Sequence, residues 1–136
     1  MNTTTIAEYE QDFHDAAQAL QEAKTIQKEA EVSRQVATLK DRVFKHEMDG
    51  HVEILKFTGE REHDRAVAQY VSCGFYGKED TGVVGRGRST ERADFLERPN
   101  LKWVEIDPTH FDVWWRMAAV AIAAFRDTIK EKIKTI

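Results

Sequence analysis

The chain has 136 residues, of which 41% are hydrophobic, 10% aromatic and 32% charged, and its formal net charge at pH 7 is −4. This length predicts one domain, large enough for a real core but too short for two. The acidic balance argues against general affinity for nucleic acid, because such proteins carry a basic face.

The cellular compartment is indicated by three features that the sequence lacks: a cysteine pair, a signal peptide and a membrane span. Cys73 is the single cysteine, so no internal disulfide can form and a reducing environment is expected. The N-terminus lacks the basic-then-apolar order of a signal peptide. No apolar stretch reaches the roughly 18 to 20 residues that span a bilayer. We therefore expect a cytoplasmic protein with no membrane partner.

The segment before Gly50 contains neither proline nor glycine, and apolar residues recur along it at helical spacing. Its first half alternates steps of three and four residues, as coiled coils do: Ile6, Tyr9, Phe13, Ala16, Leu20 and Ala23. The pattern predicts a helical arm over residues 1–49, with the helix itself running from about residue 5 to residue 48. This helix is either one rod or, if the chain breaks at 28–32 where the stripe changes phase, a hairpin.

Charge is distributed unevenly along this arm. Residues 1–23 contain five acids and no base, whereas residues 24–45 contain six bases and three acids. The helix dipole explains this polarity by itself. The alternative is antiparallel pairing, with a second copy or within a hairpin, because acid would then face base.

Residues 51–106 predict a β-rich core. Apolar alternation predicts strands near 51–58, 66–76 and 101–106, and a further extended segment begins at Val83. Residues 60–68 fit a helix equally well, and residues 77–82 have the composition of a turn. Short connections favour an antiparallel sheet of three to four strands.

Residues 108–136 predict an apolar C-terminal helix. From Val113 to Phe125 only Arg116 is polar, so this half of the helix must be covered on several sides. We expect the sheet, the first helix and a second subunit to provide that cover, and Phe125 to join the main core. The predicted fold is a single α+β domain: a long N-terminal helix or helical hairpin, a central antiparallel sheet, and an apolar C-terminal helix.

The segment from Gly82 to Arg92 is the strongest candidate for a ligand site, since it holds three glycines and three arginines. If extended, it places four polar residues on one face: Arg86, Arg88, Thr90 and Arg92. If it is instead a loop that leads into a helix, its backbone N–H groups can hold an anion. Both forms predict a phosphate or nucleotide site, and the alternatives are a solvated hairpin and a loop that binds a protein partner.

No other pattern in the sequence predicts a metal site or a catalytic group. The histidines have no metal-ligand spacing and no nucleophile has a partner in sequence, so we expect no metal, no cofactor and no catalytic residue. Trp114 and Trp115 point about 100° apart on the last helix. Either one of them anchors the core while the other meets a neighbour or a ligand, which makes this pair the candidate partner interface, or both pack in the core.

Two functions fit these features. The favoured one is a non-catalytic binding or inhibitory protein that acts as a homo-oligomer and recognises a protein partner through its β-region and helices. The alternative is a protein that binds a small anionic ligand such as a nucleotide, or a small enzyme acting on one, through residues 82–92.

Overall fold

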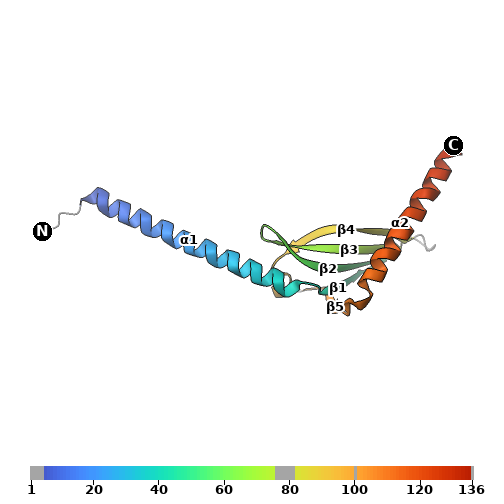
Figure 1. Ribbon diagram of the computed structural model, residues 1–136, viewed down its shortest axis with the longest axis horizontal. Coiled ribbons are helices and arrows are strands. Elements are labelled where there is room, and N and C mark those ends of the chain that lie inside the picture. Colours follow the sequence, from blue (N-terminus) through green and yellow to red (C-terminus); the bar gives the residue numbers. More distant parts are fainter. Residues whose placement is uncertain (1–4, 76–81, 100, 136) are drawn as a thin grey trace.

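The protein has the predicted α+β fold in the computed structural model, which describes residues 5–75, 82–99 and 101–135. Its elements are α1 (Ile6–Leu39), β1 (Val43–Met48), β2 (His51–Glu62), β3 (Arg65–Phe75), β4 (Gly82–Arg92), β5 (Val104–Ile106) and α2 (Phe111–Lys134). Short 3-10 turns occupy Phe95–Glu97 and Pro108–His110. The five strands form one antiparallel sheet in the order β4-β3-β2-β1-β5, rather than the three to four strands predicted (Figure 1).

Helix α1 is one continuous rod, and it is shorter than the predicted helix. The Thr5 hydroxyl accepts the Glu8 backbone N–H while the Glu8 carboxylate accepts the Thr5 N–H, which fixes the start of the helix. The helix ends at Leu39, not Met48, because the next residues turn the chain into β1: Asp41 takes a left-handed φ of 64°.

The β1–β2 hairpin replaces the predicted end of the long helix. Residues 43–48 pair antiparallel with β2, from Val43 opposite Lys56 to Met48 opposite His51. Gly50, with φ 70°, lies in the two-residue turn between them, where a left-handed conformation is needed. The predicted turn at 77–82 lies almost wholly outside the described residues, and residues 60–68 are strand and turn rather than helix.

The larger core lies on one face of the sheet. Phe44, Phe57 and Phe95 are fully enclosed there, with ring centroids 5.0 to 5.8 Å apart in edge-on arrangements. The last turns of α1 cover this cluster with Val32, Val36 and Leu39, and Trp103 packs at its margin. The rest of α1 extends away from the sheet (Figure 1).

Helix α2 packs on the other face. Its Phe111 and Ala118 are buried with Val43 and Val71, and Val43 precedes Phe44 of the first core, so the two clusters lie on opposite faces of β1. The expectation that α1 covers α2 is therefore wrong. The second half of α2 extends past the strands, and Phe125 is 62% exposed rather than part of the core.

Candidate functional site

Strand β4 carries the predicted ligand-binding residues on one face of the sheet. The segment is extended along its whole length, and Arg86 lies opposite Val71, whose side chain packs under α2. Because side chains alternate in a strand, Arg88, Thr90 and Arg92 share this face with Arg86. Of the two predicted forms, the segment is therefore the extended one, and not a loop that leads into a helix.

Each of the three arginines has a partner of its own. The Arg86 guanidinium lies 4.4 Å from the ring centroid of Trp115 and donates a hydrogen bond to its carbonyl oxygen. Arg88 pairs with Glu62, and its hydrogen bond and positive charge lower the pKa of that carboxyl. Arg92 pairs with Asp94 at 2.8 Å.

Thr90 also has a local partner, since its hydroxyl accepts a hydrogen bond from Nε of Arg65 on β3 at 2.9 Å. The second nitrogen of the same guanidinium group bonds the Thr90 carbonyl oxygen at 2.8 Å. The four predicted ligand-binding residues therefore contact four different protein partners.

The glycines of β4 have a packing explanation on the opposite face. A Cβ atom on Gly87 would lie 3.0 Å from Cε1 and 3.1 Å from Oη of Tyr70, and one on Gly85 would lie 2.8 Å from Oγ of Ser72. These positions are therefore filled by side chains of β3. The alternation of glycine and arginine follows from the two faces of an edge strand: a tyrosine ring covers one face, and polar side chains project from the other.

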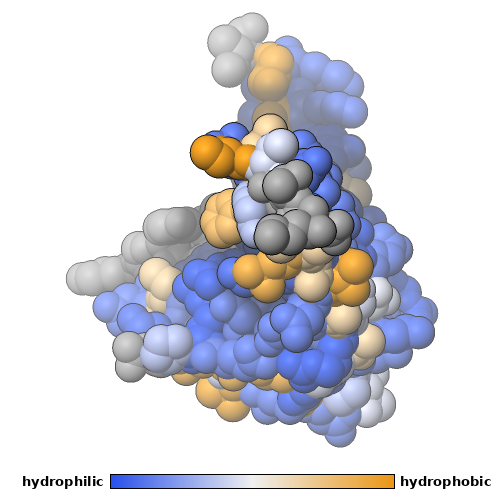
Figure 2. All heavy atoms as spheres, turned by 90° about the vertical axis from the view of Figure 1, so that its left-hand side faces the viewer, coloured by the Kyte–Doolittle hydropathy of each residue, from blue (hydrophilic) through white to orange (hydrophobic). Residues whose placement is uncertain are grey.

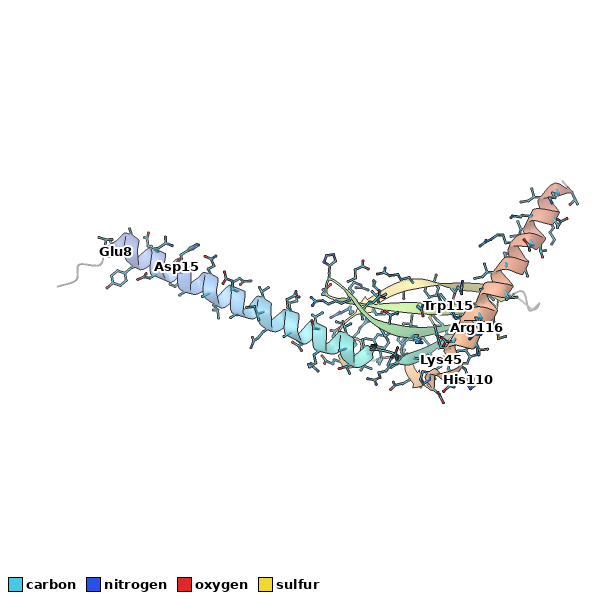
Figure 3. The ribbon with its side chains drawn as sticks, viewed as in Figure 1. Glu8, Asp15, Lys45, His110, Trp115 and Arg116 are labelled. Atoms are coloured by element: carbon cyan, nitrogen blue, oxygen red, sulfur yellow. The ribbon has the colours of Figure 1, made fainter. Side chains whose placement is uncertain are left out.

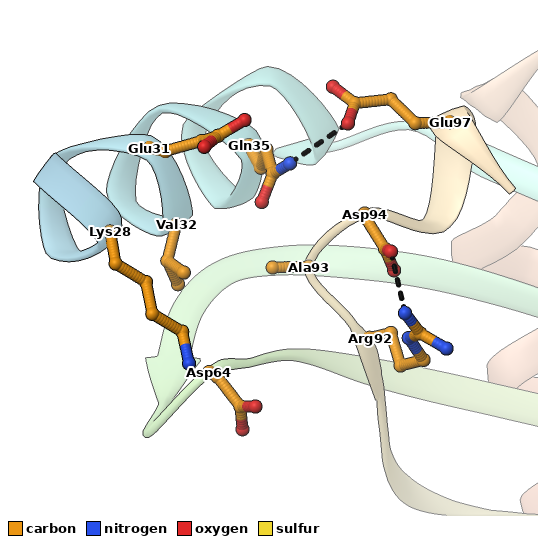
Figure 4. Close-up of a pocket in the computed structure, with 9 residues that line it drawn as sticks. All are labelled: Lys28, Glu31, Val32, Gln35, Asp64, Arg92, Ala93, Asp94 and Glu97. Atoms are coloured by element: carbon orange, nitrogen blue, oxygen red, sulfur yellow. Dashed lines mark hydrogen bonds and ion pairs between the residues drawn. The ribbon is translucent and has the colours of Figure 1, made fainter. Parts of the chain in front are cut away.

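A polar groove of about 390 Å³ lies between α1 and the end of β4 (Figure 4). Arg92 and Lys28 line it together with four carboxylates: Glu31, Asp64, Asp94 and Glu97. Gln35 donates to Glu97 across it at 3.1 Å. Acids outnumber bases in this groove, so it does not favour an anion.

A second groove, of about 320 Å³, is almost entirely apolar and lies beside α2 on the sheet. Its walls include Ile54, Cys73 and Val84 from the strands and Trp114, Met117 and Ala121 from α2. We call it the apolar groove. Sequence reasoning missed it, because its walls come from four elements whose neighbourhood only the sheet order reveals.

The two tryptophans have different surroundings. Trp115 stacks on Phe111 with ring centroids 6.1 Å apart and lies under Arg86, so it belongs to the packing of α2 on the sheet. Trp114 lines the apolar groove. Arg116, the one polar residue in this stretch, is exposed on α2 (Figure 3).

The first part of α1 is a second uncovered surface. Every residue from 6 to 31 is exposed, and from here on the arm means this segment alone, not the whole predicted helical arm. Its large apolar side chains are among the most exposed in the protein: Ile6 78%, Tyr9 65%, Phe13 78% and Leu20 57%. Figure 2 looks along α1 from its N-terminal end and shows such hydrophobic side chains among hydrophilic ones.

Comparison with known proteins gives no family: no family model, no characterised protein and no solved structure matches the chain. Within the described ranges, no three His, Cys, Asp or Glu side chains are grouped so that they could hold a metal ion. Nor does any helix in those ranges combine the length and the apolar character needed to cross a membrane.

Proposed function

We propose that the protein is a non-catalytic binding protein that works as a homo-oligomer and recognises a protein partner through the arm. The observation that supports this most is the exposed apolar stripe of α1. A helix of 34 residues buries only Val32, Val36 and Leu39 near its end, so its own domain stabilises only the last turns. A stripe with coiled-coil spacing on the rest of the helix is suited to a second helix.

The position of the stripe leaves room for that helix. Successive residues turn by 100° around a helix axis, so the stripe from Ile6 to Ala23 is centred about 140° from the direction of Val32, Val36 and Leu39. The stripe therefore faces away from the sheet. A partner helix can lie along it without meeting the strands.

The negative charge of the arm indicates which kind of partner helix fits it. The arm is acidic along the stripe, with five acids and no base before residue 24, and Glu8 and Asp15 lie on its free end (Figure 3). Pairing this segment with itself would oppose acid with acid in either direction. Three of the six bases that the sequence offered for antiparallel self-pairing, Lys40, Arg42 and Lys45, lie outside the helix. The partner that fits is an amphipathic helix whose apolar stripe is flanked by lysine or arginine.

Synthetic helical peptides test this proposal. Two peptides share a Leu/Ile stripe at heptad spacing and differ only in flanking Lys or Glu residues, and fluorescence anisotropy measures their binding to the full chain. The Lys-flanked peptide should bind at least tenfold more tightly, and Phe13→Asp should weaken it at least tenfold. Gln18→Asp adds the same charge on the other side of the arm and should change affinity less than threefold. Equal affinity of the two peptides, or equal effects of the two substitutions, would contradict the proposal.

A further inference from the structure

Helix α2 carries one apolar stripe along its whole length, although only its first half lies on the sheet. The stripe advances by steps of three and four residues: Phe111, Trp115, Ala118, Ile122, Phe125, Ile129 and Ile133. The first four are buried or half-buried. The last three are 62%, 41% and 62% exposed, because the helix has passed the edge of the sheet. The apolar stripe thus packs on the sheet in the first half of α2 and is exposed in the second half.

We call residues 123–134, the second half of α2, the overhang. Twelve helical residues span about 18 Å, roughly the width of four strands. The apolar groove lies on the same face of the sheet as α2, directly beside its first half, where Met117 and Ala121 form one wall. One chain therefore has an apolar helical stripe that no sheet covers and an apolar groove on its sheet that no second helix fills.

We propose that the overhang of one copy lies in the apolar groove of a second copy, so that two α2 helices run antiparallel across a two-fold axis. This inference names the self-interface of the proposed homo-oligomer and rests on that proposal. Two-fold symmetry makes the exchange reciprocal, and each copy then covers the overhang of the other. The stripe from Phe125 to Ile133 then packs on the apolar sheet surface of the other copy, because its own sheet does not extend beneath it.

Charge favours the antiparallel direction. Asp112 lies at the start of α2, with its side chain 70% exposed, while Lys132 and Lys134 lie in the last turn. Antiparallel packing brings the basic end of each helix toward the acidic start of the other and also aligns the helix dipoles favourably. Parallel packing would place the basic ends together.

Disulfide trapping tests the geometry, because Cys73 lines the groove and is the only cysteine of the chain. Phe125→Cys, Ile129→Cys and Ile133→Cys each place a thiol on the stripe of the overhang. Asp127→Cys and Glu131→Cys place one on the opposite side of the same helix. All five positions are exposed, so the substitutions spare the core.

Under mild oxidation at micromolar concentration, at least one stripe variant should give more than half of the chain as a reducible dimer. The Asp127→Cys and Glu131→Cys variants and the unmodified chain should give less than a tenth. Equal trapping from both sides of the helix, or trapping from neither, would overturn the inference.

Light scattering provides the second readout. The unmodified chain should have twice the 15.7 kDa mass of one chain. Ile129→Glu should shift it to the single-chain mass, whereas Ala123→Glu, which adds the same charge on an exposed side of the helix away from both the stripe and the groove, should leave the dimer intact. A single-chain mass for the unmodified protein, or a dimer that survives Ile129→Glu, would overturn this interface. Neither result depends on the arm, so peptide binding by the arm can succeed or fail separately.

Discussion

Arg86 of β4 and Trp115 of α2 join the edge of the sheet to the helix that crosses it. The guanidinium carbon lies 4.4 Å from the indole centroid, and a terminal nitrogen donates to the Trp115 carbonyl oxygen at 3.2 Å. A candidate ligand-binding residue thus acts as a packing residue, which positions α2 and one wall of the apolar groove.

Replacing Arg86 should therefore loosen α2. We expect Arg86→Ala to lower the free energy of unfolding by about 1 kcal/mol, since cation–π contacts are worth about 0.5–1 kcal/mol at exposed sites and the hydrogen bond is lost as well. Urea denaturation followed by tryptophan fluorescence measures it. Arg88→Ala is the control, because its ion pair with Glu62 at the end of β2 is exposed on both sides, with 57% and 49% of the two side chains accessible, and it should cost less. Equal effects of the two substitutions would contradict this role for Arg86.

The contact between Tyr70 and Gly87 gives a second prediction. Gly87→Ala should lower stability by about 1–3 kcal/mol, the usual cost of overpacking, because the new methyl group meets the tyrosine ring at 3.0 Å. In a Tyr70→Ala background the same substitution should cost little. A double-mutant cycle of the unfolding free energies measures the coupling. A cost for Gly87→Ala that persists without the ring would show that the glycine serves another purpose.

The sequence predicted the α+β class, the rod-like start and the apolar last helix, because hydrophobic period and the absence of glycine and proline are local signals. It did not predict where the rod ends. Asp49 and Gly50 form a hairpin turn signal, yet the residues before them also fit a helix, and a glycine ends a helix as readily as it forms a hairpin turn. Pairing with β2 and β5 decides in favour of a strand, and such pairing is not a local property.

In the candidate site, too, the local pattern could be predicted from the sequence but the contacts between elements could not. The pattern of β4 predicts from sequence alone that its arginines share a face once the segment is extended, because alternation depends only on the strand. The partners of Arg86 and Arg88 could not be predicted, since Trp115 and Glu62 come from α2 and β2, far from β4 in the sequence. The partner of Arg92 is local, because Asp94 follows it by two residues. The apolar groove likewise requires knowing which strands α2 crosses.

The pair formed by Arg42 and Glu105 predicts a pH dependence. Two hydrogen bonds of 2.6 and 2.8 Å join Arg42, just before β1, to Glu105 of β5 and lower the pKa of Glu105. A carboxyl whose pKa is lower in the folded state stabilises the fold above its unfolded pKa of about 4.3, and this contribution is lost as the pH falls through the folded pKa.

Glu105→Gln should therefore destabilise the protein at pH 7 by only about 0.2–1 kcal/mol, because the pair is partly exposed. The difference from the unmodified chain should shrink as the pH falls below about 4. Urea titrations at several pH values measure it. A difference that stays constant down to pH 2 would mean that the charge of Glu105 contributes nothing.

Phe95 and Phe125 should respond in opposite ways to truncation. Phe95 is 0% exposed, so Phe95→Ala should cost about 3–5 kcal/mol at any protein concentration. Phe125 is 62% exposed within one chain, so Phe125→Ala should leave the dilute protein nearly unchanged and weaken only the associated form. Melting curves over a concentration series separate the two effects. A large loss from Phe125→Ala in dilute solution would show that the residue packs within its own chain.

Amide hydrogen exchange over a concentration series tests most directly the central claim that the uncovered helical surfaces are binding surfaces. The account predicts that amides in residues 123–134 exchange quickly in dilute protein and become at least tenfold more protected at concentrations where the dimer forms. Amides in residues 6–23 should stay unprotected at every concentration and gain protection only when the Lys-flanked peptide is added. Fast exchange of residues 123–134 at all concentrations, together with no response of residues 6–23 to the peptide, would contradict the account.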